Sequence, residues 1–242
     1  MDTHYASVVL DNVESTQDEA AARFDGSPLL VVAEHQSSGR GRLDREWVEP
    51  DRGMFASLAF TPAWPPDRYP LIPLVAGLAM RQAIAKALGV AVDLRWPNDV
   101  MTGDAKVGGV LVETDGERVI VGCGINLFWA SPIDDAAGVV GKDPGPTAGA
   151  DLAATWTTRF LERMTAAPDL WGHHEYEAAC VTVGQPVAYE RGSGTAVGID
   201  ADGGLLVDTG NGVISVHAGD VRVDATIPTP PFDGGAVSEE ST

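Results

Sequence analysis

The chain has 242 residues, 44% of them hydrophobic and 21% charged, which is enough to bury a sizeable core in one large domain or in one domain with a small module. Its net charge of −19 argues against nucleic acid as a partner, because that binding needs basic patches, and it gives no attraction to anionic membranes. Two cysteines are too few for a disulfide framework, and the N-terminus has no signal pattern and the apolar runs are interrupted, so we expect a soluble cytoplasmic protein.

The N-terminal part is predicted to begin with a strand at 5–10 and a helix. Thr16 and Glu19 have the spacing of a capping box ahead of an alanine-rich run. Ser15 and Thr16 therefore have two interpretations: the helix start alone, or a polar helix N-terminus that also donates to a ligand. Later apolar runs predict strands at 29–33 and 55–60, and a long helix at 71–88 that ends at Gly89.

The sequence pattern in the middle of the chain predicts strands that are followed by polar residues. A strand that starts at Val92 ends at Trp96, because Pro97 cannot donate to a ladder, and Asn98 and Asp99 follow at its terminus. The later elements are a strand at 106–113, a hairpin turn at Asp115-Gly116, a return strand from Val119, a long Gly-, Pro- and Asp-rich loop at 129–150, and helices at 151–166 and 169–179.

From Val181 the pattern changes to short β-type segments separated by glycine turns, which is typical of a small barrel. The whole pattern favours an α+β protein with a mixed or antiparallel sheet over repeated βαβ units. The expected domains are a main domain at 1–180, the barrel at 181–225 and a disordered tail at 226–242. Barrel strands are expected at 187–190, 195–199, 205–208, 213–217 and 221–223.

A segment rich in glycine and arginine runs from Gly39 through Arg40, Gly41, Arg42 and Arg45 to Trp47. Each arginine offers a rigid fork of donors suited to carboxylate or phosphate, and each glycine lets the backbone approach a ligand closely. The segment therefore predicts a loop that holds an anionic ligand. A solvated basic turn is the alternative.

Further polar groups lie on separate predicted strands. Lys106 is one of only three lysines, and Asn98, Asp99 and Glu113 offer oxygens for a hard cation. Such a set fits a reaction that brings two anions together, for example a carboxylate and a nucleotide α-phosphate, and that needs no protein nucleophile. The glycine loop does not match a dinucleotide fingerprint, no Walker or zinc spacing is present, and Cys123 is better explained as a small buried thiol.

Five motifs follow one another along the chain: Glu14-Ser15-Thr16-Gln17; Gln36 with Gly39-Arg40-Gly41-Arg42 and Arg45-Glu46-Trp47; Arg95-Trp96-Pro97-Asn98-Asp99; Lys106-Val107-Gly108-Gly109-Val110-Leu111-Val112-Glu113; and Gly124-Ile125-Asn126. In this order they closely resemble biotin protein ligase (biotin–[acetyl-CoA-carboxylase] ligase). The resemblance covers 5–165 well and 181–224 more loosely. It implies a class II aminoacyl-tRNA synthetase/biotin ligase-like catalytic domain and an SH3-like β-barrel.

The resemblance implies a reaction in two steps. The carboxylate of biotin attacks the α-phosphate of Mg-ATP to give biotinyl-5′-AMP and pyrophosphate, and a lysine of a biotin carboxyl carrier protein domain then attacks the mixed anhydride. ATP and Mg²⁺ are thus the implied cofactors. Biotin and the carrier domain of a biotin-dependent carboxylase are the implied partners, and a homodimer is left open.

The resemblance also implies the site. Lys106, Arg40 and Arg42 are the expected catalytic residues, and Asn98 and Asp99 are expected at the magnesium and phosphate end. The residues expected to bind biotin and its adenylate are Ser15, Thr16, Gln36, Gly39, Arg40, Gly41, Arg42, Arg45, Trp47, Lys106, Gly109, Gly124 and Asn126.

Two other functions stay open. A lipoate–protein ligase or related acyltransferase shares the fold, but its glycine-rich arginine pattern is expected to differ from the loop here. A catalytically inactive biotin-binding sensor belongs to another class, and the intact Lys106 and arginine loop argue against it.

The chain departs from the family pattern at a few positions. Gln17 stands where many members have Asn, and Arg95 where many have Lys, so both keep the donor type. Asp44 stands where glycine is common and adds a negative charge to the loop beside Arg42, which bears on loop closure. No winged-helix segment precedes residue 5, so we expect no DNA-binding repressor function.

The acidity has two explanations, an ordinary acidic protein or one adapted to a salt-filled cytoplasm. We favour the second, halophilic explanation, because lysine is scarce while arginine is kept. At about 1 M salt the Debye length falls to roughly 3 Å and self-repulsion is screened.

Overall fold

The computed structural model describes residues 4–42, 45–217 and 221–223. They form two compact units. Of the described residues, the larger unit comprises those up to Val181 with Ala201–Gly203, and the smaller comprises Thr182–Asp200 and those from Gly204 onward. The predicted tail at 226–242 and Asp44 lie outside the described residues.

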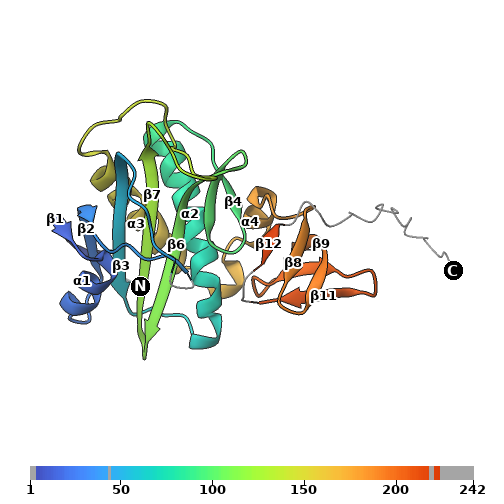
Figure 1. The fold of residues 1–242 in the computed structure, drawn as a ribbon. Coiled ribbons are helices and arrows are strands. Elements are labelled where there is room, and N and C mark those ends of the chain that lie inside the picture. Colours follow the sequence, from blue (N-terminus) through green and yellow to red (C-terminus); the bar gives the residue numbers. More distant parts are fainter. Residues whose placement is uncertain (1–3, 43–44, 218–220, 224–242) are drawn as a thin grey trace. The chain divides into compact units, whose positions relative to one another are not determined.

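The larger unit is built on a seven-stranded mixed sheet with the strand order β1-β2-β3-β7-β6-β5-β4 (Figure 1). The strands β1 and β2 pair in parallel, and the other neighbours pair antiparallel. The predicted α+β class with a mixed sheet is thus confirmed. The strands are β1 (Ala6–Val13), β2 (Leu29–Gln36), β3 (Arg52–Phe60), β4 (Asp93–Arg95), β5 (Asp99–Thr102), β6 (Ala105–Asp115) and β7 (Arg118–Phe128).

Two long helices, α2 (Ile72–Leu88) and α3 (Ala148–Met164), pack on each other and cover one face of this sheet (Figure 1). The rings of Phe60 on β3 and Phe160 on α3 meet edge to face at 5.6 Å, and Trp156 Nε1 donates to the carbonyl of Ala76 at 3.2 Å. The predicted stop of α2 at Gly89 is confirmed, because this glycine adopts φ 68° at the C-cap. The main hydrophobic core lies between these helices and the sheet.

The helical stretch Pro66–Leu88 contains a short 3₁₀ helix, η2 (Pro66–Leu71), followed by α2. By length and composition alone it could cross a membrane, whereas the sequence predicted that Pro and Gly interrupt such runs. Pro73 lies in the first turn, where a missing N–H costs nothing, so it does not break the helix. In the described part of the chain this stretch is the one candidate span, and 61% of its apolar window is buried inside the protein.

The opposite face of the sheet carries the short helix α1 (Thr16–Arg23), which contacts β2, β3 and β7. The predicted capping box is wrong by one residue. Ser15 is the N-cap, its side chain accepts from the backbone N–H of Gln17 at 3.2 Å, and Thr16 is the first helical residue. The side chain of Thr16 is therefore available to the sheet rather than to its own helix.

Helix boundaries after the sheet also differ from prediction. The helix α3 begins at Ala148, three residues before the predicted start at Asp151. The predicted helix at 169–179 is two elements, η3 (Pro168–Leu170) and α4 (His173–Ala179), because Gly172 between them has φ 105° and interrupts the helical backbone.

The long loop after β7 is held to the sheet by backbone hydrogen bonds. Lys106 donates to the carbonyl of Asp135 at 2.8 Å and accepts from Ala137 at 3.0 Å. Further along, Val139 donates to the carbonyl of Asn126 at 2.8 Å. These bonds give the loop the partners that a long irregular segment in a compact domain needs.

The smaller unit is a five-stranded antiparallel sheet with the order β11-β10-β9-β8-β12. All five predicted strands are present within a few residues of their expected bounds. In the described part of this unit no ladder joins β11 to β12, so the predicted small barrel is corrected to an antiparallel sheet that does not close. The strands are β8 (Pro186–Tyr189), β9 (Gly192–Ile199), β10 (Leu205–Asp208), β11 (Val213–Val216) and β12 (Arg222–Val223).

Candidate functional site

A buried polar cluster joins α1, β2 and β3. The Oε1 atom of Gln36 accepts from both the backbone N–H and the Oγ1 of Thr16, at 2.8 and 3.0 Å. Thr16 Oγ1 also lies 2.8 Å from Ser57 Oγ. Each hydroxyl therefore has a partner, which burial requires. Ser57 was not predicted as a site residue, although a lone serine within the apolar run of β3 was the available signal.

The glycine-arginine segment forms a small hairpin that directly follows the end of β2. Trp47 donates from its backbone to Gly39 at 2.9 Å, and Gly41 donates to the carbonyl of Arg45 at 2.7 Å. A Cβ on Gly39 would lie 3.1 Å from Trp47 Cβ and 3.2 Å from Gln36 Nε2, so the close approach of the two hairpin arms favours glycine there. We call residues 37–47 the hairpin loop; its residues 43 and 44 are outside the described part.

The first two arginines of the hairpin loop, Arg40 and Arg42, have different partners. Arg40 donates to both carboxylate oxygens of Asp18 on α1, at 2.7 and 2.8 Å, and its Nη2 lies 3.7 Å from Glu113 on β6. Arg42 Nη1 donates to Asn98 Oδ1 at 3.1 Å. The hydrogen bonds from Arg40 lower the pKa of Asp18, and Asp18 in turn raises the pKa of Arg40.

The lysine at the start of β6 is held by an acidic residue of β5. Lys106 Nζ lies 2.7 Å from Asp99 Oδ1 and 5.9 Å from the centroid of the Trp47 ring. The other oxygen of Asp99 accepts from Arg95 Nε and Nη2, at 3.1 and 2.8 Å. Asp99 therefore positions two cations at once. A Cβ on Gly109 would lie 3.5 Å from Lys106 Nζ, which is an ordinary van der Waals contact, so the ammonium lies close to this position of β6.

Glycines on two adjacent strands open the face on which these groups meet. Gly109 of β6 and Gly124 of β7 are direct partners across the ladder, so both present their α-carbons to the same side. A Cβ on Gly124 would lie 2.8 Å from Trp47 Cζ2, which means that the indole lies flat against the glycine backbone. Asn126 follows two residues later on the same side, and its Oδ1 is buried with no hydrogen-bond partner among the described residues.

The predicted metal ligands do not fit a resident ion. Both oxygens of Asp99 are taken by cationic side chains, and Asn98 Oδ1 accepts from Arg42. Across residues 4–42, 45–217 and 221–223 there is no group of three or more His, Cys, Asp or Glu side chains that could hold a metal. Asn98 and Asp99 are therefore better explained as residues that orient Arg42, Lys106 and Arg95.

Cys123 is buried between the two glycines of β7, as predicted. Its side chain points to the face of the sheet opposite Gly122 and Gly124. Burial raises the pKa of the thiol far above its usual range, so the thiolate that a nucleophile needs is not formed near neutral pH.

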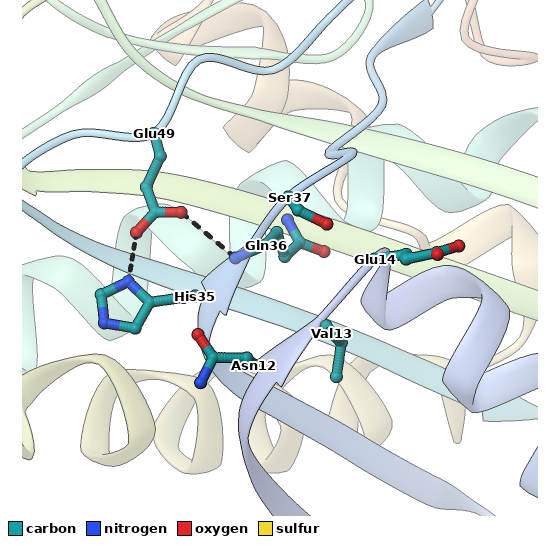
Figure 2. A pocket seen from close by; sticks show the side chains of 7 residues that line it. All are labelled: Asn12, Val13, Glu14, His35, Gln36, Ser37 and Glu49. Atoms are coloured by element: carbon teal, nitrogen blue, oxygen red, sulfur yellow. Dashed lines mark hydrogen bonds and ion pairs between the residues drawn. The ribbon is translucent and has the colours of Figure 1, made fainter.

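An open cavity of about 390 Å³ adjoins the ends of β1 and β2 (Figure 2). In Figure 2 the Glu49 carboxylate joins the His35 ring, Nδ1 at 2.5 Å, to the backbone N–H of Gln36 at 3.2 Å. Gln36 is one of the residues that line this cavity, and its side chain also belongs to the buried polar cluster. The remaining lining residues are Asn12, Val13, Glu14 and Ser37.

The structure brings most of the predicted site together. Contacts link Thr16, Gln36, Gly39, Trp47, Gly124, Gly109 and Lys106 in an unbroken series, and join Arg42 to Asn98. Ser15 caps helix α1, and the backbone of Arg45 makes hydrogen bonds within the hairpin turn. The guanidinium of Arg40 faces Asp18 and Glu113.

Comparison with known proteins gives consistent matches over both units. Residues 10–126 match the Biotin/lipoate A/B protein ligase family, and residues 182–223 match the Biotin protein ligase C terminal domain. A biotin–[acetyl-CoA-carboxylase] ligase of Mycobacterium tuberculosis is 31% identical over 219 residues, which cover 84% of this chain and 81% of that protein. The one of Paracoccus denitrificans is 30% identical over 227 residues, which cover 82% and 92%.

Solved structures agree with the sequence matches. A biotin protein ligase from Aquifex aeolicus in complex with biotin and ATP superposes with a TM-score of 0.78 at 26% identity, covering 90% of this chain and 99% of that chain. One from Leishmania major in complex with biotinyl-5-AMP gives a TM-score of 0.63 at 25% identity, with 88% and 99% covered.

Proposed function

Because the chain belongs to the biotin protein ligase family, we propose that it activates biotin with ATP and transfers it to a lysine of a biotin carboxyl carrier domain. The observation that carries this proposal is the place of Lys106. Its ammonium lies against Gly109, beside the Trp47 ring and at one end of the glycine face that β6 and β7 share. A cation held there can meet a carboxylate and a phosphate together.

In the first step an oxygen of the biotin carboxylate attacks the α-phosphorus of ATP, and the bond to the pyrophosphate oxygen breaks. Both reactants are anions, so the chain must supply positive charge where they meet. Lys106 and Arg42 supply it from two sides, and Asp99 and Asn98 hold them in position. As the phosphate charge rearranges, Lys106 exchanges part of its contact with Asp99 for the ligand. The products are biotinyl-5′-AMP and pyrophosphate.

In the second step the amine of the carrier lysine attacks the acyl carbon of the mixed anhydride, and AMP leaves. This step needs no covalent enzyme intermediate. The buried Cys123 thiol is unsuited to form one. The hairpin loop covers the ligand through the backbone of Gly39 and Gly41 and the ring of Trp47, and Ser15, Thr16, Gln36 and Asn126 complete the proposed binding set.

We further propose that magnesium enters as the counter-ion of ATP, since the phosphates can carry it without resident carboxylate ligands. The strong negative charge supports a halophilic protein of the cytoplasm that does not use nucleic acid as a partner. Sedimentation in molar salt tests whether the protein forms a homodimer.

The test is transfer of labelled biotin to a purified carrier domain, with and without ATP, in molar salt. We expect labelling only with ATP, and release of one pyrophosphate for each adenylate formed. Lipoate serves as the competing substrate. Transfer of lipoate in preference to biotin would assign the chain to a lipoate ligase, and tight biotin binding without pyrophosphate release would assign it to a sensor.

A further inference from the structure

The end of β2 extends beyond the part that pairs with β3. Pairing of β2 with β3 stops at Ala33↔Phe55, whereas its pairing with β1 continues to Val13↔Gln36. Successive N–H groups of a strand point to opposite edges, and Ser37 donates its N–H to the carbonyl of Val13 on β1 at 3.0 Å. The N–H of Gln36 therefore points to the edge from which β3 has departed, and it needs a partner from elsewhere.

The side chain of Glu49 supplies that partner (Figure 2). Its Oε2 accepts from the backbone N–H of Gln36 at 3.2 Å, and its Oε1 lies 2.5 Å from His35 Nδ1. The Glu49 side chain is 29% exposed and borders the open cavity at the ends of β1 and β2. Because a carboxylate accepts more strongly than a neutral oxygen, it makes up for the strand that is missing at this edge.

Glu49 links two segments that the hairpin loop separates. Both of its partners directly precede the hairpin loop, whereas Glu49 follows two residues after Trp47. Within the loop, the two arms are joined by backbone hydrogen bonds such as that from Trp47 to Gly39 at 2.9 Å. One carboxylate therefore fixes the base from which both arms of the loop start.

The base of the loop sets the position of two groups in the candidate site. Gln36 Oε1 accepts from the backbone N–H and the Oγ1 of Thr16, and the ring of Trp47 lies against Gly124. If the base opens, both groups can move relative to the sheet. A fixed base leaves fewer conformations to be lost when a ligand binds, which raises affinity without any new contact to the ligand.

We infer that Glu49 is a positioning residue for biotin, because its carboxylate holds the base of the hairpin loop closed. This inference rests on the proposed function. Lys106 and Arg42 keep their own partners, Asp99 and Asn98, whether or not Glu49 is present. Loss of Glu49 should therefore weaken biotin binding and leave the chemical step nearly unchanged.

The first test compares Glu49→Ala with Glu49→Gln by steady-state release of pyrophosphate with biotin and ATP. For Glu49→Ala we expect the KM for biotin to rise about 3- to 10-fold, the loss of roughly one net hydrogen bond, and kcat to stay within about 2-fold. The carboxamide of Glu49→Gln still accepts from the N–H of Gln36, so it should recover most of the affinity. The matched control is Glu162→Ala, which removes an exposed 3.0 Å ion pair with Arg159 on α3 and should change neither parameter.

The second test measures the base of the loop directly, without biotin. Trypsin cuts after arginine, and its cleavage of the hairpin loop tracks how often the loop opens. For Glu49→Ala we expect cleavage within the loop to be about 3- to 10-fold faster, while cleavage after Arg191, in the exposed turn between β8 and β9, stays the same. A merely structural glutamate predicts faster cleavage at both places and a lower melting temperature.

The outcomes distinguish this inference from the proposed function. If the wild-type protein releases pyrophosphate with biotin and Glu49→Ala changes neither the KM nor the cleavage of the loop, the inference is overturned while the ligase assignment stands. Equal acceleration in the loop and at Arg191, or a KM for Glu49→Gln as high as that for Glu49→Ala, also overturns the inference. If the wild-type protein releases no pyrophosphate with biotin, both are overturned.

Discussion

Arg40 of the hairpin loop and Asp18 of α1 are joined by two hydrogen bonds of 2.7 and 2.8 Å, so one side chain ties the loop to the helix whose N-terminus lines the site. We expect Asp18→Asn to release this tie and to speed biotin dissociation by about 2- to 5-fold, a modest factor because both side chains are exposed. Stopped-flow displacement of labelled biotin measures it.

The matched control is Glu19→Gln on the same helix. It removes a 2.8 Å ion pair with Arg23 that does not involve the loop. Equal dissociation rates for Asp18→Asn and the wild type would show that the pair does not hold the loop. Because the pair is exposed, its effect should also shrink as salt is added.

The same pair predicts a pH dependence with a definite sign. The hydrogen bonds from Arg40 lower the pKa of Asp18 below its usual value of 3.8, so its contribution to stability is present above that value and is lost as pH falls through the folded-state pKa. Carboxyl-detected NMR titration should place Asp18 below 3.8 and move it upward in Arg40→Gln. An Asp18 titration that is the same in both proteins would contradict the pairing.

Lys106→Ala should slow adenylation on the order of 100- to 1,000-fold, because a charge contact that strengthens in the transition state is lost. Pyrophosphate release under single-turnover conditions measures the chemical step. Lys86→Ala, an exposed lysine in the last turn of α2, is the control and should leave the rate unchanged. A normal rate for Lys106→Ala would remove this residue from the mechanism.

Gly124→Ala should weaken biotin binding through Trp47. The added methyl would lie 2.8 Å from the indole, which has to move, and such overpacking costs about 1–3 kcal/mol. Calorimetry should show the weaker Kd, and the tryptophan emission of the free protein should shift. Gly141→Ala is the control, since a Cβ there meets nothing within 4 Å. Native affinity in Gly124→Ala would mean that Trp47 does not wall the site.

The halophilic proposal predicts that salt stabilises the protein. With a net charge of −19, self-repulsion is strongest in dilute buffer and is screened at molar salt. The melting temperature should therefore rise steadily from low to molar potassium chloride. Comparison with sodium sulfate at equal ionic strength separates screening from a general salting-out effect. A melting temperature that does not change with salt would refute this proposal.

Local patterns predicted most of the fold. The stop of α2 at Gly89, the hairpin at Asp115-Gly116 and all five strands of the smaller unit depend on neighbours in sequence, so their signals are visible there. The cap of α1 was misplaced by one residue because Ser15 and Thr16 are both good caps. Barrel closure was over-predicted because pairing of distant strands leaves no local signal.

The sequence predicted the candidate site only in part, as it did the fold. Motif order pointed to Lys106, Gly109 and Gly124, but not to the partners that hold them. Asp99 was expected near a metal, and only the fold shows that Arg95 and Lys106 occupy both its oxygens. Ser57 and the pairing of Arg40 with Asp18 join segments far apart in sequence, so spacing along the chain does not predict them.

The central ladder of the larger unit has a consequence for synthesis of the protein. β3 pairs with β7 from Arg52↔Phe128 to Phe60↔Val119, and the chain between them contains α2 and three strands. Ser57 therefore cannot meet Gly122 until residue 122 has left the ribosome, and the ladder is complete only after residue 128 has followed. A nascent chain that ends before β7 lacks the sheet face on which the ligand would bind. Biotin therefore cannot guide the early stages of folding. Biotin should instead be retained only by ribosome-bound chains that have already completed the sheet.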